Sequence, residues 1–397
     1  MPTMTHHGPE NQVPRPLAGC RVLEFAGIGP APFCGMLLAD MGADVLRIDR
    51  CDSIELGTPV QPGFDVLGRG KRSLALDLKT PSHVHHVMAL VERADVLLEG
   101  FRPGVMERLE LGPEPCLAAN PRLVFARMTG WGQHGPLARS AAHDINYIAV
   151  TGALHAVGRA GDAPVPPLAL VGDFGGGGMF MAVGVLGALL EARRTGHGQV
   201  VDAAICDGAA LLMSPYFARH AEGQWRDERE ANLLDGGAPW YGCYETSDGR
   251  HVAIGALEGR FYEQLVATLG LNLASLPDRR NRQNWPALRA LFATTFRQHT
   301  RAHWCQLLEG TDACFAPVLS LTEAPQHPHL QARGTFDFSQ GYPQPAAAPR
   351  FSRSPPAAPA APPRRGEGGA DALRDWGFTP EAVEEMASHG VVFEYKE

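Results

Sequence analysis

The stretch that decides the fold is Arg21-Val22-Leu23-Glu24-Phe25-Ala26-Gly27-Ile28-Gly29, together with the later run Ala43-Asp44-Val45-Leu46-Arg47-Ile48-Asp49-Arg50. Both runs are rich in Val, Leu and Ile, and each predicts a β-strand. The segment between them, through Met36 to Met41, predicts a helix of about a dozen residues. Strand, glycine turn, helix and strand make a βαβ unit, which favours a parallel α/β layer.

The same alternation continues along the chain. We expect helices at about 82–93 and 176–194 and strands at 95–99, 123–128 and 199–203. Residues 16–215 are therefore predicted to form a large Rossmann-like α/β domain with a parallel sheet. From about residue 240 the pattern changes to short strands (241–245, 251–255) and helices near 260–269 and 285–298, which predicts a smaller α+β domain over 225–335.

The two ends differ from these domains in composition. Residues 1–15 are polar and are predicted to be a disordered leader without the apolar run of a signal peptide. The stretch 343–363 is rich in Pro and Ala and has no helical or strand period, so we interpret it as an extended linker. Within 364–397 we expect two short helices, at 370–376 and 379–388.

Bulk composition excludes several classes of function. The 397 residues carry a net charge of -8 without clustered Lys and Arg, which argues against a nucleic-acid partner. The eight cysteines are spread singly and form no CxxC pair, which fits the cytoplasm and indicates neither a disulfide framework nor a thiolate metal site. The longest apolar run, 179–190, is shorter than the ~20 residues that a membrane span needs, so we expect a buried helix and no membrane partner.

The first βαβ unit resembles a dinucleotide-binding motif, but only in part. Gly27 and Gly29 follow a strand, and Asp49 closes the next strand where an acid would contact a ribose. Pro32 stands where the third glycine of the motif belongs and would block the close approach of helix and strand. We therefore interpret the two glycines as a structural turn and set a nicotinamide cofactor aside.

Three segments carry candidate chemistry, and each also has a purely structural interpretation. His143 lies among polar residues beside an apolar run, where a lone histidine is more often structural than catalytic. Asp173 precedes four glycines, 175–178, and could simply cap the following helix. Glu258 ends a strand before a helix and could also be a cap. The histidines of 83–86 are interpreted as solvated surface rather than a metal site, since no acid or thiolate accompanies them.

Longer motifs connect these segments. The chain contains Arg69-Gly70-Lys71-Arg72-Ser73-Leu74-Ala75-Leu76-Asp77-Leu78-Lys79, Arg102-Pro103-Gly104-Val105-Met106-Glu107-Arg108, His143-Asp144-Ile145-Asn146-Tyr147, Gly172-Asp173-Phe174-Gly175-Gly176-Gly177 and Leu234-Asp235-Gly236-Gly237-Ala238-Pro239. In this order, from Pro16 to about Pro349, the sequence resembles the class III CoA-transferase family, and within it the branch of acyl-CoA racemases.

The resemblance implies a set of site residues. His143 and Asp173 match the catalytic acid/base pair of that branch, and Glu258 matches an acid near the same site. Arg102 and Arg108 stand where basic side chains would meet the CoA phosphates. The remaining matches to substrate- or CoA-binding positions are Arg50, Leu76, Asp77, Leu78, Lys79, Ala142, Asp144, Ile145, Asn146 and Tyr147. Two departures are Ala142, where the family usually has glycine, and Gly259-Arg260, where Pro-Gln is common.

The resemblance also implies a reaction and an assembly. The expected activity is inversion of the α-carbon of a 2-methylacyl-CoA thioester by proton transfer, without a metal or a cofactor other than the CoA of the substrate. The alternative is CoA transfer, with Asp173 as the nucleophile. An interlocked homodimer is implied, with residues 364–397 returning to the large domain. For proton transfer Asp173 would need an apolar setting that raises its pKa, and we expect backbone N–H groups of 173–178 to stabilise the enolate.

Overall fold

The computed structural model describes residues 15–51, 60–355 and 358–393, so the predicted leader lies almost wholly outside the described residues. The chain forms two compact units. The first unit consists of the described residues up to Thr151, the range Leu168–Leu212 and the described residues from Ala332 onward. Gly152–Pro167 and Met213–Gln331 make the second.

A six-stranded sheet organises the first unit, and all of its strand pairs are parallel. The strands are β1 (Arg21–Phe25), β2 (Asp44–Arg50), β3 (Lys71–Leu76), β4 (Val96–Glu99), β5 (Val124–Thr129) and β6 (Val200–Ala204). Their order, β3-β2-β1-β4-β5-β6, is that of a doubly wound Rossmann-like sheet. The predicted α/β class and parallel sheet are confirmed.

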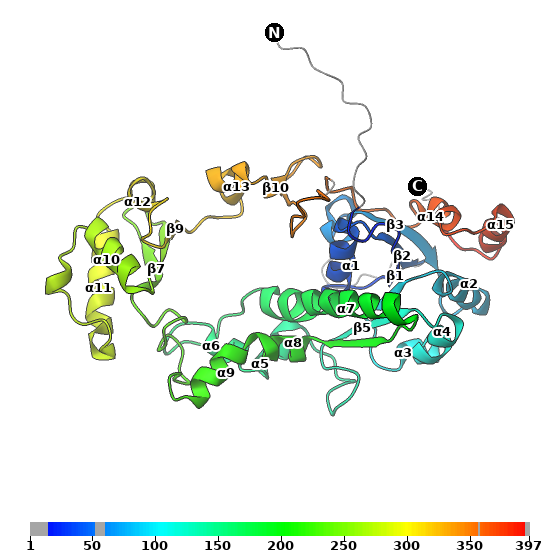
Figure 1. Ribbon diagram of the computed structural model, residues 1–397, viewed down its shortest axis with the longest axis horizontal. Helices are drawn as coiled ribbons and strands as arrows, with labels where there is room; N and C mark the ends of the chain where they lie inside the picture. Colours follow the sequence, from blue (N-terminus) through cyan, green and yellow to red (C-terminus); the bar gives the residue numbers. More distant parts are fainter. Residues whose placement is uncertain (1–14, 52–59, 356–357, 394–397) are drawn as a thin grey trace, which may run out of the picture. The chain divides into compact units, whose positions relative to one another are not determined.

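Alternating side chains of these strands build two hydrophobic cores, one on each face of the sheet. Val22, Val96 and Val124 face a core with helices α1 (Pro30–Asp40) and α7 (Phe180–Thr195). Leu23, Leu97 and Phe125 face the opposite core, with α2 (Pro81–Val91), α4 (Pro113–Ala119) and α14 (Gly369–Asp375). Figure 1 shows α7 running along one side of the strands. The period of two along each strand thus distributes the apolar residues between two helical layers.

Further elements complete the first unit. They are α3 (Val105–Arg108), α5 (Asp144–Ala149), the π-helix η3 (Leu170–Met179), α8 (Ile205–Leu212), α15 (Pro380–Ser388) and a two-stranded ribbon of β10 (Phe336–Asp337) and β11 (Gln344–Pro345). The expected C-terminal helical pair is present as α14 and α15. Together η3 and α7 form one helical run, Leu170–Thr195, that is long and apolar enough to cross a membrane by length and composition. Met181, Val185 and Leu189 of this run are buried against the sheet, as in a core helix.

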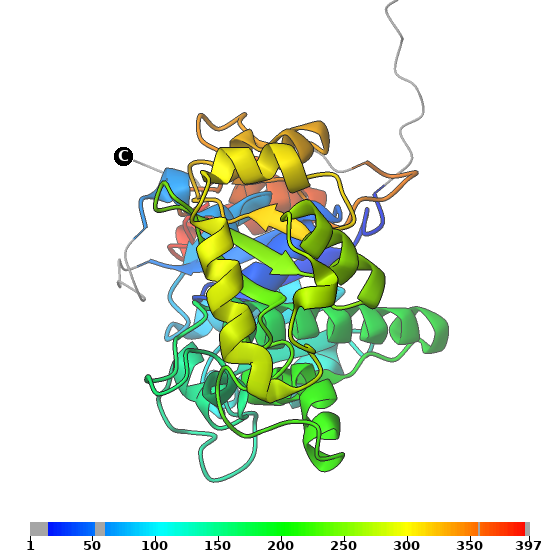
Figure 2. The ribbon, with the colours of Figure 1, turned by 90° about the vertical axis from the view of Figure 1, so that its left-hand side faces the viewer.

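The second unit contains a three-stranded antiparallel sheet of β7 (Tyr241–Glu245), β8 (His251–Gly255) and β9 (Phe315–Pro317). Helix α11 (Trp285–Phe296) crosses this sheet in Figure 2, where it is the long yellow helix. Its Phe292 and Phe296 are fully buried in the core of the unit. The remaining helices that bear on this unit are α6 (Ala153–Ala156), α9 (Ser214–Ala221), α10 (Gly259–Thr268), α12 (Arg301–Leu308) and α13 (Pro328–Ala332). The predicted strands and helices from residue 240 onward are confirmed.

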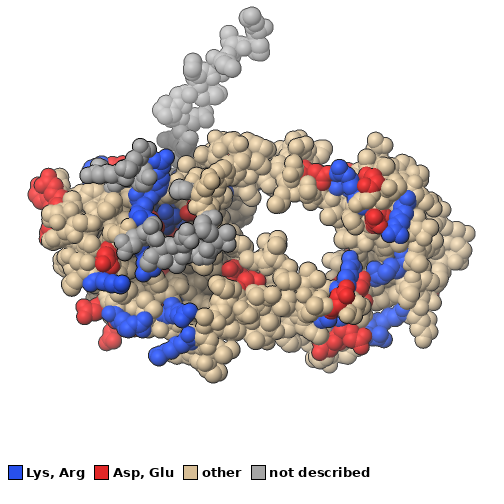
Figure 3. Space-filling view, turned by 180° about the vertical axis from the view of Figure 1, so that it is seen from behind, with Lys and Arg blue, Asp and Glu red and all other residues tan. Residues whose placement is uncertain are grey.

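Charged side chains are mixed in sign over the surface. On the face drawn in Figure 3, acidic and basic side chains alternate on each unit, and neither sign gathers into a continuous field. Many of these charges are paired within their unit; Arg297 with Glu245 is one example, with nitrogen and oxygen 2.6 Å apart. A mixed surface of this kind leaves recognition of an anionic ligand to individual unpaired arginines.

Candidate active site

The carboxyl ends of the strands converge on the turn between β1 and α1. In a sheet of this order, ligands bind outside the carboxyl ends of the strands where the strand order reverses, here between β1 and β4. Gly29 precedes α1 with φ 70° and ψ -120°. A Cβ atom on Gly29 would lie 3.0 Å from Oδ2 of Asp173, so this glycine borders the Asp173 carboxylate. The turn that the sequence indicated as merely structural therefore forms one wall of the candidate site.

Asp173 lies within the π-helix η3 and not at a helix N-cap, so the capping interpretation is wrong. A π-helix of ten residues is rare, and π-helical turns are frequent at functional sites. The glycines that follow allow η3 to pack closely. A Cβ on Gly176 would lie 2.6 Å from the Ala209 nitrogen of α8, and one on Gly178 would lie 2.7 Å from the Phe33 ring of α1. These glycines serve helix packing, which in turn holds Asp173 in place.

The Asp173 carboxyl is partly buried and lacks a strong cationic partner. Its pKa is raised from 3.8 to about 6, first by burial and then by the neighbouring Asp144 carboxylate, while His143 opposes both effects. Among the described residues, no Lys or Arg forms an ion pair with Asp173. A carboxyl group with a pKa near neutrality can both accept and donate a proton, which is the property required of an acid/base catalyst.

Asp144 ties the two candidate catalytic segments together. The backbone N–H of Asp173 donates to Oδ1 of Asp144, with nitrogen and oxygen 2.7 Å apart. Gly172 makes room for this contact, since a Cβ there would lie 2.2 Å from the same oxygen. The Phe174 N–H donates to the Ala169 carbonyl at 3.0 Å. The first two N–H groups of 173–178 are thus occupied, which corrects the expectation that they stabilise an enolate oxygen.

His143 is exposed immediately before α5 and is held by its neighbours. Its backbone N–H donates to the Asn146 side-chain oxygen at 3.1 Å. The Tyr147 hydroxyl donates to the Ala142 carbonyl at 2.6 Å, which anchors the peptide that precedes His143. Tyr147 itself packs edge-on against Trp131, with ring centroids 4.8 Å apart. Ala142 is not among the described residues with positive φ, so alanine fits here without backbone strain.

Two predicted CoA-binding groups that are distant in the sequence meet at the sheet edge. Arg50, the last residue of β2, pairs in register with Leu76, the last residue of β3. The Leu76 side chain is only 2% exposed and packs in the core, so a ligand can meet this position only through its backbone. Asp77 and Lys79 follow at the surface, and the Lys79 N–H donates to Oδ1 of Asp77 at 3.0 Å.

Arg102 and Arg108 are exposed, and neither forms an ion pair within the described part of the chain. The loop that carries Arg102 is fastened by Glu99, whose Oε2 accepts from the Phe101 N–H at 2.7 Å. Arg127 in turn donates to Oε1 of the same glutamate at 2.7 Å. A rigid loop presenting an unpaired guanidinium is suited to holding a phosphate group.

Glu258 belongs to the second unit, where it is the residue before α10 and makes no side-chain hydrogen bond to that helix. Glu258 therefore occupies the N-cap position of α10 but does not cap the helix with a side-chain hydrogen bond. Beside it, the Arg260 guanidinium lies 4.4 Å from the centroid of the Phe261 ring. The role of Glu258 near His143 stays a prediction based on the family resemblance.

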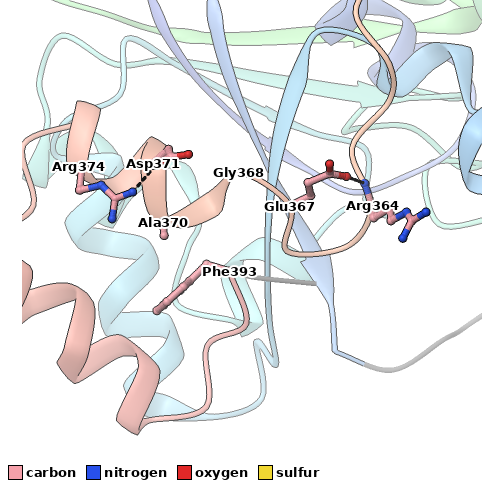
Figure 4. A pocket seen from close by; sticks show the side chains of 7 residues that line it. All are labelled: Arg364, Glu367, Gly368, Ala370, Asp371, Arg374 and Phe393. Carbon is pink, nitrogen blue, oxygen red and sulfur yellow. Dashed lines mark hydrogen bonds and ion pairs between the residues drawn. The ribbon is translucent and has the colours of Figure 1, made fainter. Parts of the chain in front are cut away.

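A cavity of about 490 Å³ lies in the C-terminal segment of the first unit (Figure 4). Its walls are Arg364, Glu367, Gly368, Ala370, Asp371, Arg374 and Phe393. Arg374 pairs with Asp371, and the Arg364 N–H donates to Glu367 at 2.7 Å, so part of its polar lining is already satisfied. None of the predicted catalytic or binding residues lines this cavity.

Comparisons with known proteins agree with this geometry. The sequence profile described as CoA-transferase family III matches residues 17–368. α-Methylacyl-CoA racemase of Mus musculus is 45% identical over 95% of this chain and 97% of its own length. The Homo sapiens racemase is 44% identical over the same shares. A crystal structure of a CaiB/BaiF family protein from Brucella suis superposes with a TM-score of 0.79 at 26% identity, covering 92% of this chain and 100% of that one.

Proposed function

Because the chain belongs to CoA-transferase family III, we propose that it is an isomerase that inverts the α-carbon of 2-methylacyl-CoA thioesters. Its high identity to two α-methylacyl-CoA racemases supports this activity. The observation that carries the proposal is the state of the Asp173 carboxyl, which lies near His143. Its pKa is raised to about 6, and it has no Lys or Arg partner among the described residues. Inversion needs one group that removes the α-proton and another that returns a proton to the opposite face.

In the proposed mechanism His143 and Asp173 serve as this pair. An imidazole can accept or donate a proton near neutral pH, and a carboxyl group with a pKa of about 6 can do the same. One of them removes the α-proton, which leaves an enolate with negative charge on the thioester oxygen. The other protonates the opposite face. Which group serves which enantiomer follows from the side on which the methyl group is bound.

We propose that the CoA moiety binds along the carboxyl ends of the strands. Arg50 and the backbone of 76–79 would hold one part of it, since Arg50 and Leu76 are paired in register. Arg102 and Arg108 would meet the phosphates, because both guanidinium groups are exposed and form no ion pair with any described residue. The segment 142–147 would line the acyl thioester. Glu258 would orient or charge-tune His143, as the third group of an acid/base constellation often does.

The alternative is CoA transfer, in which the Asp173 carboxylate attacks the thioester carbon and CoA leaves as the thiolate. The thiolate would open the resulting anhydride at the aspartyl carbonyl, which frees the first carboxylate and leaves an aspartyl-CoA thioester. A second carboxylate would displace the thiolate from this thioester to give a new anhydride, and attack of the thiolate on its acyl carbonyl would form the new acyl-CoA and regenerate Asp173. The family description favours this reaction, and a pKa of about 6 leaves the Asp173 carboxyl mostly ionised above neutral pH. Racemisation is preferred because His143 supplies the second base, for which transfer has no use.

Hydrogen exchange at the α-carbon separates the two reactions. The protein is incubated with (R)- and with (S)-2-methylacyl-CoA in heavy water, with and without a free carboxylate, and α-deuterium is followed by mass spectrometry. Racemisation gives exchange and loss of optical purity without an acceptor. Movement of CoA only in the presence of the acceptor would refute the proposed isomerase and identify a transferase.

Variants assign the exchange to the site. His143→Ala is expected to lower the interconversion of the two enantiomers by about 10²–10⁴-fold, the usual contribution of a positioned acid or base. His197→Ala is the matched control, since His197 is also exposed but lies in the turn after α7. Full activity of His143→Ala would reject the assignment of this residue.

We further propose a homodimer in the cytoplasm. The outer face of α7 supports an interface, because Val183 and Leu190 are 63% and 70% exposed and lie two turns apart on one side of the helix. The eight free cysteines fit a reducing compartment. Light scattering coupled to size exclusion should give twice the mass of the 42.7 kDa chain. The Val183→Lys/Leu190→Lys variant should shift the mass toward one chain; an unchanged mass would place the interface elsewhere.

A further inference from the structure

The segment 76–79 leaves the edge strand β3 beside the end of the chain. Ala75 and Val392 exchange two backbone hydrogen bonds, with the Ala75 N–H donating at 2.7 Å and the Val392 N–H at 2.8 Å. The bridge is antiparallel and isolated. The last described residues thus pair with the end of this edge strand, while the Ser73 N–H near its start donates to the Glu367 carbonyl at 2.9 Å. Contacts that fix the turn after α15, which leads to Val392, therefore also help to fix the end of β3.

A histidine from α2 connects the same two segments from the other side. His83 is buried, and its Nδ1 accepts from the Asp77 N–H at 2.9 Å. Its Nε2 lies 2.8 Å from the His389 carbonyl. Because a carbonyl oxygen can only accept, Nε2 donates to His389, and Nδ1 faces both the N–H and the carbonyl oxygen of Asp77, which lies 3.0 Å away. One imidazole therefore joins the backbone of Asp77 to the turn that follows α15.

A second histidine of α2 holds the same turn through a side chain. Nε2 of His86 lies 2.8 Å from Nδ1 of His389, and the two rings stack with centroids 5.1 Å apart. Burial, together with His389, His85 and His83, lowers the pKa of His86, while Glu385 opposes this effect. His83 and His86 are each only 5% exposed, so the prediction that the histidines of 83–86 are solvated surface is wrong for both. The described residues contain no group of metal ligands there.

We propose that His83 is a positioning residue for CoA binding, which fixes the backbone of 76–79 between α2 and the C-terminal turn. The inference rests on the proposed function through the assignment of 76–79 to CoA. The Leu76 side chain is buried, so at this position a ligand meets only backbone groups, and backbone groups bind well only when they are held still. His83 contacts the backbone of Asp77 and His389 and not the acid/base pair, so its loss is expected to weaken binding and to spare the chemical step.

Substitutions at His83 test this in the full-length protein. His83→Ala should raise the KM for 2-methylacyl-CoA and the Kd for free coenzyme A by about five- to tenfold, the loss of one or two hydrogen bonds, with kcat within about twofold. His83→Asn keeps an acceptor for the Asp77 N–H and should restore most of the affinity. His85→Ala changes an exposed neighbour on the same helix and should alter neither constant.

The C-terminal side gives an independent variant for the case in which His83→Ala folds poorly. Val392→Pro removes the N–H that donates to the Ala75 carbonyl and changes a partly exposed residue near the chain end. It should raise the Kd for coenzyme A by about threefold, and the His83→Ala/Val392→Pro double variant should show less than the product of the two effects. Unchanged Kd values, or a fall in kcat at constant Kd, would overturn the proposal.

We call the positioning of 76–79 by His83 the clamp. Its failure can be distinguished from failure of the proposed function. Binding of free coenzyme A, measured by calorimetry, needs no turnover and reports on the CoA-binding positions without the acid/base pair. If the unsubstituted protein exchanges no α-deuterium but His83→Ala still weakens coenzyme A binding, the isomerase is refuted and the clamp stands. If exchange occurs and the Kd for coenzyme A does not respond to His83→Ala, the clamp is refuted and the isomerase stands.

Discussion

Two carboxyl groups of the first unit, Glu24 and Asp173, are both removed from water but have opposite surroundings. Glu24 is fully buried on β1, where Lys71 Nζ donates to both of its oxygens at 2.7 Å. Asp173 is partly buried on η3 beside another carboxylate and a histidine. Burial raises the pKa of both acids, but only Glu24 has a cation in contact to oppose it.

The difference shows what separates a structural acid from a catalytic one. The Glu24 and Lys71 groups satisfy each other, and Lys71 also donates to the Pro32 carbonyl at 2.9 Å, so the pair has no group left to react. Gly35 makes room for it, since a Cβ there would lie 1.7 Å from Oε2 of Glu24. Asp173 keeps an unsatisfied carboxyl at the edge of a site, and such perturbed, unpaired groups are candidates for proton transfer.

The comparison predicts its largest effect for Asp173→Asn. The amide cannot take or return a proton, so conversion of one enantiomer into the other should fall by about 10²–10⁴-fold in both directions. Circular dichroism and coenzyme A binding should stay unchanged, because the backbone of η3 is held by its own packing and by Asp144. Racemisation at more than a tenth of the original rate would show that Asp173 is not the second acid/base group.

Glu24→Gln should act on stability instead. It leaves the buried Lys71 ammonium without its counter-charge, which typically costs about 3–5 kcal/mol of unfolding free energy. The rate per folded molecule should hold within about twofold, because the hydrogen bonds of the pair go to each other and to Pro32 and not to His143 or Asp173. Urea unfolding measures the first quantity and exchange assays the second.

The matched control is the Glu24→Leu/Lys71→Met double variant, which removes both charges and should recover much of the lost stability. If Glu24→Gln proves as stable as the unsubstituted protein, or if it loses turnover while folded, the distinction between the two acids is wrong.

Five of the six strands of the large sheet, and their parallel arrangement, were predicted from the sequence, and β3 is the instructive exception. Lys71, Arg72 and Ser73 open this strand and gave no apolar pattern, so it was not predicted. Their polar groups are satisfied by remote partners: Lys71 by Glu24 and Arg72 by Asp44, the latter with nitrogen and oxygen 2.5 Å apart. A pattern of apolar residues cannot reveal a strand whose buried charges are neutralised by residues far along the chain.

Only part of the candidate site was predicted, because the rest depends on residues that are remote in the sequence. His143 and Asp173 were recognised through motifs, whereas Gly29 and the packing role of Gly176–Gly178 depend on distances that only the folded chain defines. The burial of His83 was missed because its partner, His389, comes from the other end of the chain. The sequence offered one signal for the role of Gly29, namely the glycine turn that directly follows the first strand.

A smaller effect concerns the pH dependence of stability. In the folded protein the pKa of Asp173 is about 6, above its ordinary 3.8. The folded state therefore holds this proton more tightly than the unfolded state. The stability this confers is complete below about pH 4 and is lost as the pH rises through about 6.

Asp173→Asn, which stays neutral, should thus gain stability relative to the unsubstituted protein between pH 4 and 7, by roughly 1–3 kcal/mol. Chemical unfolding at pH 4.5 and 7.5 measures the change. The Glu309→Gln variant, at an exposed acid of the second unit paired with His327, is the control for general pH effects. An equal stability difference at both pH values would mean that the Asp173 pKa is not raised.

The smallest expected effect separates charge from geometry at Asp144. Asp144→Asn keeps an oxygen for the Asp173 N–H and removes the neighbouring charge, which is the second cause of the raised pKa. The limb of the pH–rate profile that belongs to Asp173 should move to lower pH by less than about one unit, the size of a single neighbouring-charge effect. The maximal rate should hold within about threefold.

Asp144→Ala removes the acceptor as well, and should lower the rate by about tenfold by freeing the peptide of Asp173. The two substitutions remove the same charge, so any difference between them measures what the 2.7 Å hydrogen bond contributes to the position of the carboxyl group. Equal behaviour of the two variants would mean that η3 alone sets the geometry. In that case Asp144 acts on Asp173 only as a charge, and the contrast with Glu24 reduces to the presence or absence of a cation.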